Sequence, residues 1–474
     1  MIKSHVEESL GANPGDAALN PADSVAMGVQ AARAPRWLAS TRGRAFRALA
    51  HREYRLLFAA FVVNQTGFWL SHISMQGLMV ELSGNDPLWL GFLFFALFIP
   101  AFVLAPIAGV AADRFDRKRI ILICYASVSA LMGVLTALTA SDALGPRLLL
   151  GLALVLGAAF AFSGPASFAL AANVVPDADL PSAVSLQSAA NNLTRVLGPA
   201  LAAPLVATSH FEIAFAFFLV AGLVAAVITG LMRVPALAYD DDDSGMLARL
   251  RSGFDHARER KPAVPALLTV AALSLFGVSH VALLPVYAEV VLGQKAAFAW
   301  LVAATGLGAT LGALVTGQRK EAPTLRGSAV RMAGYAIALG VFASTSNLWV
   351  ALIAQFVIGY FYFSVMTGLQ TLIQQIVDDS KRGRVMSLFQ VAWAGLVPFG
   401  GLGMGIAGNT VGVVATLLGA AACCGAFALA MTWLAGRLSA RSERAAAIAG
   451  PDILESGRES QLDSARSRRV VDSS

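Results

Sequence analysis

Three polar residues, spaced four positions apart, interrupt an apolar stretch of the sequence. Gln187, Asn191 and Arg195 have this spacing, so they form a polar stripe on one face of a helix. A guanidinium in apolar surroundings needs an anion or several carbonyl groups as partners. We therefore expect Arg195 to contact an oxygen-rich or anionic substrate. The alternative role is a structural hydrogen bond to a neighbouring helix.

Other apolar stretches carry polar and aromatic residues at the same spacing. In one of them the residues that recur every four positions are Tyr362, Met366, Gln370 and Gln374. A cavity built from such stretches has amides, aromatic rings and one cation in its walls, which suits a bulky, oxygen-rich amphipathic solute. Each polar side chain could instead bond one helix to the next. Further candidates for substrate contact, from two other stretches, are Gln65, His72 and His280.

The composition shows which kind of molecule must position these residues. The chain has 474 residues, of which 57% are hydrophobic and 14% are charged. Soluble domains typically carry ~25% charged residues. A chain this apolar cannot cover a soluble surface with polar atoms, which excludes an ordinary soluble enzyme and a disordered scaffold. A polytopic all-α membrane protein remains, and at about 20 residues per crossing its length allows about twelve crossings.

The apolar runs fall into two sets. The first set lies near 56–82, 88–112, 118–140, 147–172, 182–208 and 212–233, and the second near 263–290, 297–318, 328–346, 348–377, 384–408 and 412–436. These runs predict a six-helix half at 56–233 and a second six-helix half at 263–436. The predicted segments outside them are a tail with a basic amphipathic segment (1–55), a central loop (234–262) and a closing tail (437–474).

The two sets resemble each other in sequence. The first crossing contains Ser-His-Ile at 71–73 and Glu81, and the seventh contains Ser-His-Val at 279–281 and Glu289, with the same spacing. This echo indicates two homologous halves. Parallel repeats of this kind belong to transporter folds with the substrate site between the halves.

The basic residues predict the orientation of the chain in the membrane. The chain contains 35 Lys and Arg residues. On the map above, Arg147 and Lys295 lie on the side opposite the termini, and Arg195 lies within a crossing. Positive residues concentrate on the cytoplasmic side, so both termini are predicted to be cytoplasmic. The net charge of +6 then reflects membrane topology, and nucleic-acid binding is not needed to explain it.

The loop after the second crossing carries the most specific motif. It reads GVAADRFDRKR from Gly109 to Arg119 and resembles the signature G-x3-D-[RK]-x-[GD]-R-[KR]-[RK] of the major facilitator superfamily. The resemblance implies twelve transmembrane helices in two pseudo-symmetric six-helix bundles. It also implies that Gly109, Asp113, Arg114 and Arg117 form a charge cluster that latches the outward-open state. The alternative is a basic loop that only sets topology.

A longer segment narrows the resemblance. Residues 173–204 are similar to the corresponding segment of the siderophore-exporter branch, typified by the enterobactin exporter. This implies secondary active export of a siderophore-like metabolite by alternating access. Macrolide and multidrug exporters share these patterns and are the alternative. GPALAAP at 198–204 resembles the antiporter motif G-P-x2-G-G, with Ala202 and Ala203 in place of two glycines. The branch implies proton antiport by a monomer in the bacterial inner membrane.

Proton coupling needs a titratable carrier, and no Asp or Glu lies at the predicted mid-membrane positions. The remaining candidates are His72, His280, Glu81 and Glu289. A histidine titrates near neutral pH and could carry a proton. Either histidine could instead line the cavity without a coupling role.

Several other functions lack their sequence signals. The three cysteines lie within apolar runs without metal-ligand spacing, and the chain contains no Gly-Lys pair and hence no phosphate-binding loop. No metal, cofactor or enzymatic activity is expected. The alternatives that stay open are a multidrug or macrolide efflux pump, an importer and a non-transporting receptor. Arg195 favours neutral or anionic cargo over lipophilic cations.

Overall fold

The computed structural model describes residues 43–234, 256, 258, 262–319, 321–378, 381–437 and 440. Throughout these residues the secondary structure is helical, which confirms the all-α prediction. Ten helical segments among them are long and apolar enough to cross a membrane. Most of the predicted tails and of the central loop lie outside the described residues.

The first half contains six long helices. Each begins and ends within a few residues of the predicted crossing. The helices are α2 (Arg52–Ser83), α3 (Pro87–Arg114), α4 (Arg117–Ala140), α5 (Pro146–Val174), α6 (Leu180–Ala207) and α7 (Phe211–Gly230), with the short 3-10 helices η2 (Gly43–Ala50) and η3 (Asp177–Asp179) before α2 and α6.

The second half is less regular than the first. Two of its crossings are interrupted by π or 3-10 turns. Its elements are α9 (Ala263–Ala272), the π turn η4 (Leu273–Gly277), the 3-10 helix η5 (Val278–Leu283), α10 (Leu284–Val290), α11 (Ala297–Gly317), α12 (Leu325–Ala343), α13 (Leu348–Ile376), α14 (Arg382–Gln390), the π turn η7 (Val391–Gly395), α15 (Val397–Val411) and a last helical span at Val413–Arg437.

Local sequence signals end and restart the helices at short turns. After α2, Gly84 adopts φ +65°, a left-handed conformation that glycine allows at low cost. Asp86 then caps α3 by accepting a hydrogen bond from the Leu88 backbone N–H, and Pro87 occupies the first turn of the helix. Asp116 caps α4 in the same way. Because the turns between these caps are short, consecutive helices run antiparallel.

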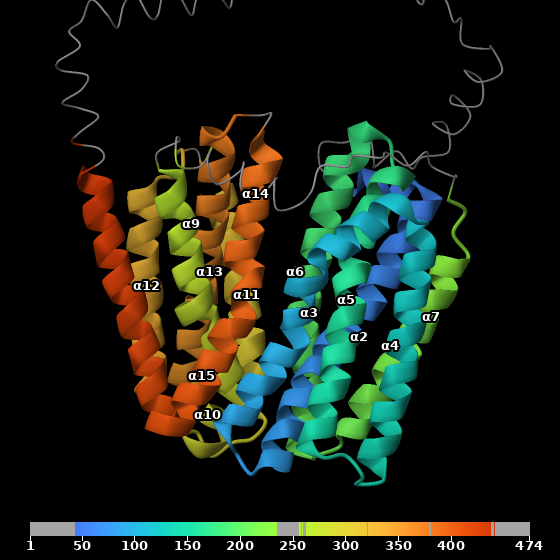
Figure 1. Ribbon diagram of the computed structural model, residues 1–474, viewed down its shortest axis with the longest axis horizontal. Helices are drawn as coiled ribbons and strands as arrows, with labels where there is room; N and C mark the ends of the chain where they lie inside the picture. Colours follow the sequence, from blue (N-terminus) through green and yellow to red (C-terminus); the bar gives the residue numbers. More distant parts are fainter. Residues whose placement is uncertain are drawn as a thin grey trace, which may run out of the picture.

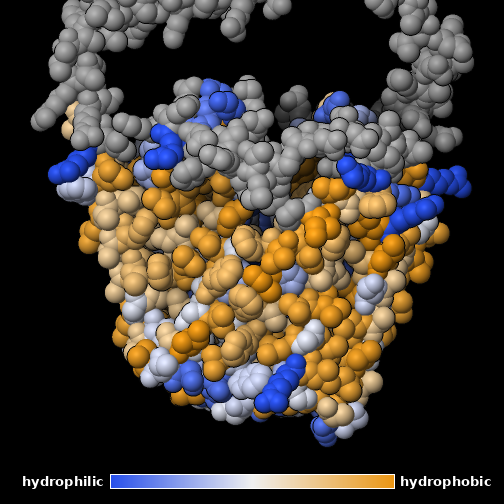
Figure 2. Space-filling model, viewed as in Figure 1, coloured by the Kyte–Doolittle hydropathy of each residue, from blue (hydrophilic) through white to orange (hydrophobic). Residues whose placement is uncertain are grey.

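The two halves form bundles that stand side by side (Figure 1). The visible face is apolar over its middle and hydrophilic toward both ends (Figure 2). Large apolar side chains such as Ile123, Val227 and Leu429 are more than 60% exposed. Such exposure is costly in water and favourable against lipid chains, so the outer faces of both bundles suit a bilayer.

The bundles meet closely at one end, which carries Glu81, Ser209 and Lys295 and which we call the Glu81 end. There α3 packs against α15, and a Cβ added to Gly91 would lie 2.8 Å from the Cα of Gly405. Only glycine at both positions permits this approach. The opposite end, where α3 meets α4, is called the Arg117 end.

The described part of the predicted amphipathic segment packs on the protein itself. In η2 the Ala48 N–H donates to Ser182 Oγ at 3.1 Å. Asp179 lies 2.9 Å from His51 Nε2 and 3.7 Å from Arg47 Nε. These contacts hold the start of α2 against the start of α6.

Candidate functional site

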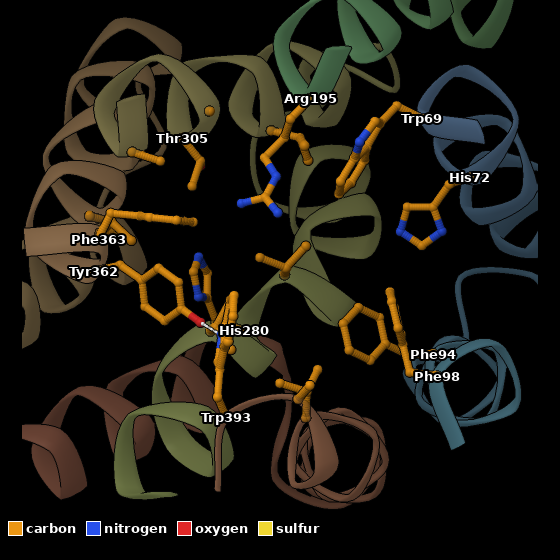
Figure 3. Close-up of a pocket in the computed structure, with 18 of the residues that line it drawn as sticks. Trp69, His72, Phe94, Phe98, Arg195, His280, Thr305, Tyr362, Phe363 and Trp393 are labelled. Carbon is orange, nitrogen blue, oxygen red and sulfur yellow. Dashed lines mark hydrogen bonds between the residues drawn. The ribbon is translucent and has the colours of Figure 1, made fainter. Parts of the chain in front are cut away.

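A cavity of about 230 Å³ lies between the two halves (Figure 3). The first half contributes side chains from α2, α3 and α6. The second half contributes side chains from η5, α11, α12, α13, η7 and α15. Of the predicted contact residues, four line it: His72, Arg195, His280 and Tyr362.

Arg195 extends from α6 into this cavity (Figure 3). Its guanidinium carbon lies 5.1 Å from the ring centroid of Trp69 in the first half and 5.4 Å from that of Phe363 in the second. Its Nε is buried and has no hydrogen-bond partner among the described residues. No carboxylate of the described chain lines the cavity. The cation is therefore held by aromatic faces, with no protein anion to neutralise it.

Close helix packing determines where Arg195 lies. One turn further along α6, a Cβ on Gly198 would come within 2.3 Å of Trp69 Cβ, so α6 can approach α2 only with glycine there. On the other side, a Cβ on Gly306 of α11 would lie 3.4 Å from the Arg195 carbonyl oxygen. These two glycines place Arg195 where the halves meet.

His72 lies on the first-half side of the cavity, in the continuous helix α2. Its Nε2 is 3.0 Å from Gln76 Nε2, so the amide donates to an unprotonated ring nitrogen. The ring stacks on Phe68 with centroids 5.7 Å apart and meets Phe98 of α3 edge-on at 5.8 Å.

His280 lies on the second-half side, in η5, where the crossing departs from α-helical geometry. Its Nδ1–H donates to the Gly277 carbonyl at 2.8 Å, and its Nε2 lies 3.2 Å from the Gln355 amide nitrogen. Gln355 Oε1 accepts from Thr305 Oγ1 at 2.8 Å. The Tyr335 hydroxyl is 3.3 Å from His280 Nδ1. The imidazole is thus held by partners on α11, α12 and α13.

Tyr362 also has a partner within the second half. Its hydroxyl accepts a hydrogen bond from Trp393 Nε1 at 2.7 Å. Trp393 belongs to the π turn η7, so this bond ties α13 to the irregular part of the eleventh crossing. The second-half wall combines this pair with the His280 network.

The comparison with protein families identifies the molecule. Residues 44–457 match the family model described as transmembrane secretion effector. The chain belongs to this family of the major facilitator superfamily. It is therefore a multi-pass membrane transporter, and its family and relatives are transporters and not enzymes.

Relatives of this transporter are 23–26% identical to it over two thirds or more of the chain. An uncharacterized MFS-type transporter, YfiS of Bacillus subtilis, is 26% identical over 75% of this chain and 87% of its own. The staphyloferrin A transporter of Staphylococcus aureus is 24% identical over 76% and 91%. Macrolide efflux protein A of Streptococcus pyogenes is 23% identical over 67% and 80%.

Solved structures confirm the predicted fold. The nucleoside transporter NupG superposes with a TM-score of 0.63 at 13% identity, covering 80% of this chain and 98% of its own. A bacterial homologue of the lysosomal transporter Spinster gives 0.60 at 17% identity, covering 82% and 97%. The transporter thus has the twelve-helix fold in which α6 and α12, the two less apolar helices, complete the two bundles.

The other predicted contact residues lie outside the cavity lining. Gln65 Nε2 donates to Asn191 Oδ1 at 3.0 Å, which joins α2 to α6 within the first half. Gln187 is 1% exposed, and neither of its side-chain polar atoms has a partner in the described part of the chain. Gln370 is exposed. The four-residue spacing predicts which residues share one face of a helix, but it does not predict which helix or cavity that face meets.

The predicted latch residues lie at the Arg117 end. A Cβ on Gly109 would meet nothing within 4 Å, so no described helix approaches it closely. Arg117 Nε donates to the Ala112 carbonyl at 2.9 Å, across the turn between α3 and α4. Arg114 is exposed, and the Asp113 side chain lies outside the described atoms.

Glu81 and Glu289 are not among the residues that line the cavity. Glu81 forms an ion pair with Lys295 of the other half and accepts from Ser209 Oγ at 2.7 Å. Lys295 Nζ also donates to Ser209 Oγ at 2.7 Å. One oxygen of Glu289 is buried with no partner in the described residues. Glu81 therefore bridges the halves at the end where they pack most closely.

The sequence analysis missed several cavity residues. Gln355 is a fully buried amide in α13. It lies seven positions, or two helical turns, before Tyr362, and this spacing could have placed it on the same face of the helix. Phe363, Thr305 and Trp393 carried no distinguishing pattern, because aromatic and small residues are common in all the crossings.

Proposed function

We propose that this transporter exports a small oxygen-rich or anionic metabolite, a siderophore foremost, by alternating access. The observation that carries the proposal is the Arg195 guanidinium, which lies between the two halves with no carboxylate among the described residues that line the cavity. A buried cation of this kind is costly unless a ligand supplies the missing charge. Membership of a transmembrane secretion family and similarity to the staphyloferrin A transporter support export of such a compound.

Macrolide or multidrug efflux is the second candidate. It is favoured by the three macrolide efflux relatives and by the aromatic walls of the cavity. A pump for lipophilic cations needs a negative counter-charge, and the described cavity lining has none. This observation ranks an anionic cargo first.

Alternating access gives the two ends different roles. The basic residues Arg114, Arg117, Lys118 and Arg119 lie at the Arg117 end, which supports a cytoplasmic position for that end and for both termini, in the bacterial inner membrane. The packed Glu81 end then faces outward and is closed. Gly109, around which a Cβ would meet nothing within 4 Å here, is approached by the other half when the Arg117 end closes.

Protons are the coupling ion in this proposal, and a single chain is the working unit. His72 and His280 are the titratable histidines in the cavity lining. Both change their surroundings when the halves separate, so either can bind a proton on one side and release it on the other. Glu81 and Glu289 serve as further candidates at the outward end.

Transport direction and cargo are tested together. Medium from wild-type and deletion cells is compared by mass spectrometry, and the compound that the deletion strain fails to release is then measured in proteoliposomes with an imposed pH gradient. Gradient-driven accumulation of an anionic compound supports the proposal. Release of an unchanged set of compounds, uptake in the opposite direction, or tight binding without flux contradicts it.

The latch is tested by Asp113→Asn. Removal of the charge weakens a contact made in one conformation only, so transport should fall about fivefold or more while expression is unchanged. Export at the wild-type rate would leave the motif as a topology signal.

A further inference from the structure

The polar groups of the cavity are distributed unevenly between its walls. On the first-half wall, Arg195 Nε and Trp69 Nε1 are both buried N–H donors without acceptors among the described residues. Figure 3 shows these two side chains next to each other, with the guanidinium extending into the cavity. Both groups can only donate. These two N–H groups therefore need an acceptor from a ligand. A carboxylate or another oxyanion would accept their hydrogen bonds and also neutralise the charge of Arg195.

Most of the rest of the lining is apolar. Phe94 and Phe98 of α3 form an aromatic pair with centroids 4.7 Å apart. Figure 3 places this pair and Trp393 across the cavity from Arg195. The second half also contributes the apolar side chains of Val278, Val281, Val302 and Ile358 to the lining. A ligand loses little by placing a ring or an aliphatic body here, and it gains contact area.

The charges in the lining set the charge of the ligand. Arg195 is the one Lys or Arg residue among the described residues that line the cavity, and none of them is Asp or Glu. His280 has both ring nitrogens engaged. His72 Nε2 accepts from Gln76, so His72 Nδ1 carries a neutral N–H, which can donate but supplies no counter-charge. A second or third anionic group on a ligand would therefore meet walls without a second cation, which is costly.

We infer that the site selects amphipathic monoanions: one oxyanion binds at the Arg195–Trp69 corner, and an aromatic or aliphatic body fills the space beside Phe94, Phe98 and Trp393. This rests on the proposed function, because it concerns the same cavity, and it specifies the class of substrate. Compact polyanions and lipophilic cations are disfavoured by the same walls.

The test is a binding series on the full-length protein in lipid nanodiscs, measured by calorimetry with empty nanodiscs as the blank. The probes are 1-naphthoate, the neutral 1-naphthamide, the cationic 1-naphthylmethylammonium and citrate. Naphthoate should bind about 10- to 100-fold more tightly than naphthamide, because only the carboxylate forms a charged hydrogen bond. Citrate and the cation should bind more weakly than naphthoate by at least about tenfold.

Variants assign the charge preference to its residue. Arg195→Ala should bind naphthoate and naphthamide equally, and Arg195→Lys should keep part of the preference. Arg147→Ala, which removes an exposed arginine at the start of α5, is the matched control and should behave as wild type. If Arg195→Ala does not fold, the order of the four probes on the wild-type protein decides alone.

Three results would overturn the inference: citrate binding as tightly as naphthoate, naphthamide binding as tightly as naphthoate, or tightest binding of the cation. The proposed function fails separately, when proteoliposomes transport no organic compound although naphthoate binds with the expected preference. Transport of a polyanion with weak naphthoate binding would refute the inference and leave the proposed function intact.

Discussion

The two halves carry the same Ser-His pair at matching positions, yet they surround the histidine differently. His72 lies in an unbroken helix beside Trp69, and the described cavity lining around the nearby Arg195 holds no carboxylate. His280 lies in a 3-10 segment after a π turn, within a network that satisfies both of its ring nitrogens. The first-half wall thus offers a ligand a cation and buried N–H donors, whereas the histidine of the second half is bonded within its own half.

This difference indicates that the two homologous halves have different roles in the transporter. Unpaired donors on a regular, rigid helix suit recognition of a charged group. Interrupted helices such as α9–α10 and α14–α15 have fewer regular backbone hydrogen bonds and often occur at functional hinges. We therefore assign binding of the polar end of the cargo to the first half, and adaptation of the cavity shape to the second.

The largest expected effect comes from the first half. Arg195→Ala should lower transport of an anionic cargo by about 10- to 100-fold, because the charged hydrogen bond is lost. Initial rates in proteoliposomes, corrected for the amount of folded protein, measure this effect. Wild-type rates in a stably folded variant would show that Arg195 is structural and would remove the proposed asymmetry.

A substitution in the second half should lower the stability of the protein and leave its preference for anionic ligands unchanged. Gln355→Leu leaves His280 Nε2 and Thr305 Oγ1 without their buried partner, which should lower the free energy of unfolding by about 1–3 kcal/mol. Thermal unfolding in detergent measures the loss. The preference for naphthoate over naphthamide should persist. A variant that loses this preference at unchanged stability would place recognition in the second half as well.

A smaller effect is expected at the contact between the halves. Lys295→Gln removes the ion pair with Glu81, a partly exposed interaction worth about 1 kcal/mol or less, so the population open at the Glu81 end should rise by up to about fivefold. Spin labels at Ser141→Cys and Ser344→Cys, with the native cysteines replaced, report the separation of the halves.

Charge removal within one half provides the control for that measurement. Arg52→Gln breaks the ion pair with Glu53, which lies entirely in the first half. It should leave the distance distribution unchanged. Equal distributions for Lys295→Gln and the wild-type protein would mean that the ion pair does not hold the Glu81 end closed.

The smallest effect is expected from Gln370→Ala. The side chain is exposed and lies outside the cavity lining, so transport should stay within about twofold of wild type, the range of ordinary surface substitutions. A large loss of transport would add a second-half amide to the recognition surface.

Part of the fold and of the cavity can be predicted from the sequence. Hydropathy located the crossings, because spanning a bilayer imposes a length and a composition on each helix. The four-residue spacing found Arg195 and Tyr362, which do line the cavity. It grouped Asn191 with them, although Asn191 bonds to Gln65 within the first half, because periodicity fixes a face but not the helix that meets it.

The π turns and the Gln355 network could not be predicted from one sequence. A π turn depends on how a crossing packs against its neighbours, and no residue at 273–277 or 391–395 marks it. Gln355 acquires its role from contacts with η5 and α11, both distant along the chain.

The most direct test of the account is a structure of the transporter with 1-naphthoate bound. We expect a carboxylate oxygen within about 3.2 Å of an Arg195 or Trp69 nitrogen, with the naphthalene ring against Phe94 and Phe98. A ligand whose carboxylate lies away from Arg195, with that guanidinium paired to a protein carboxylate, would contradict it.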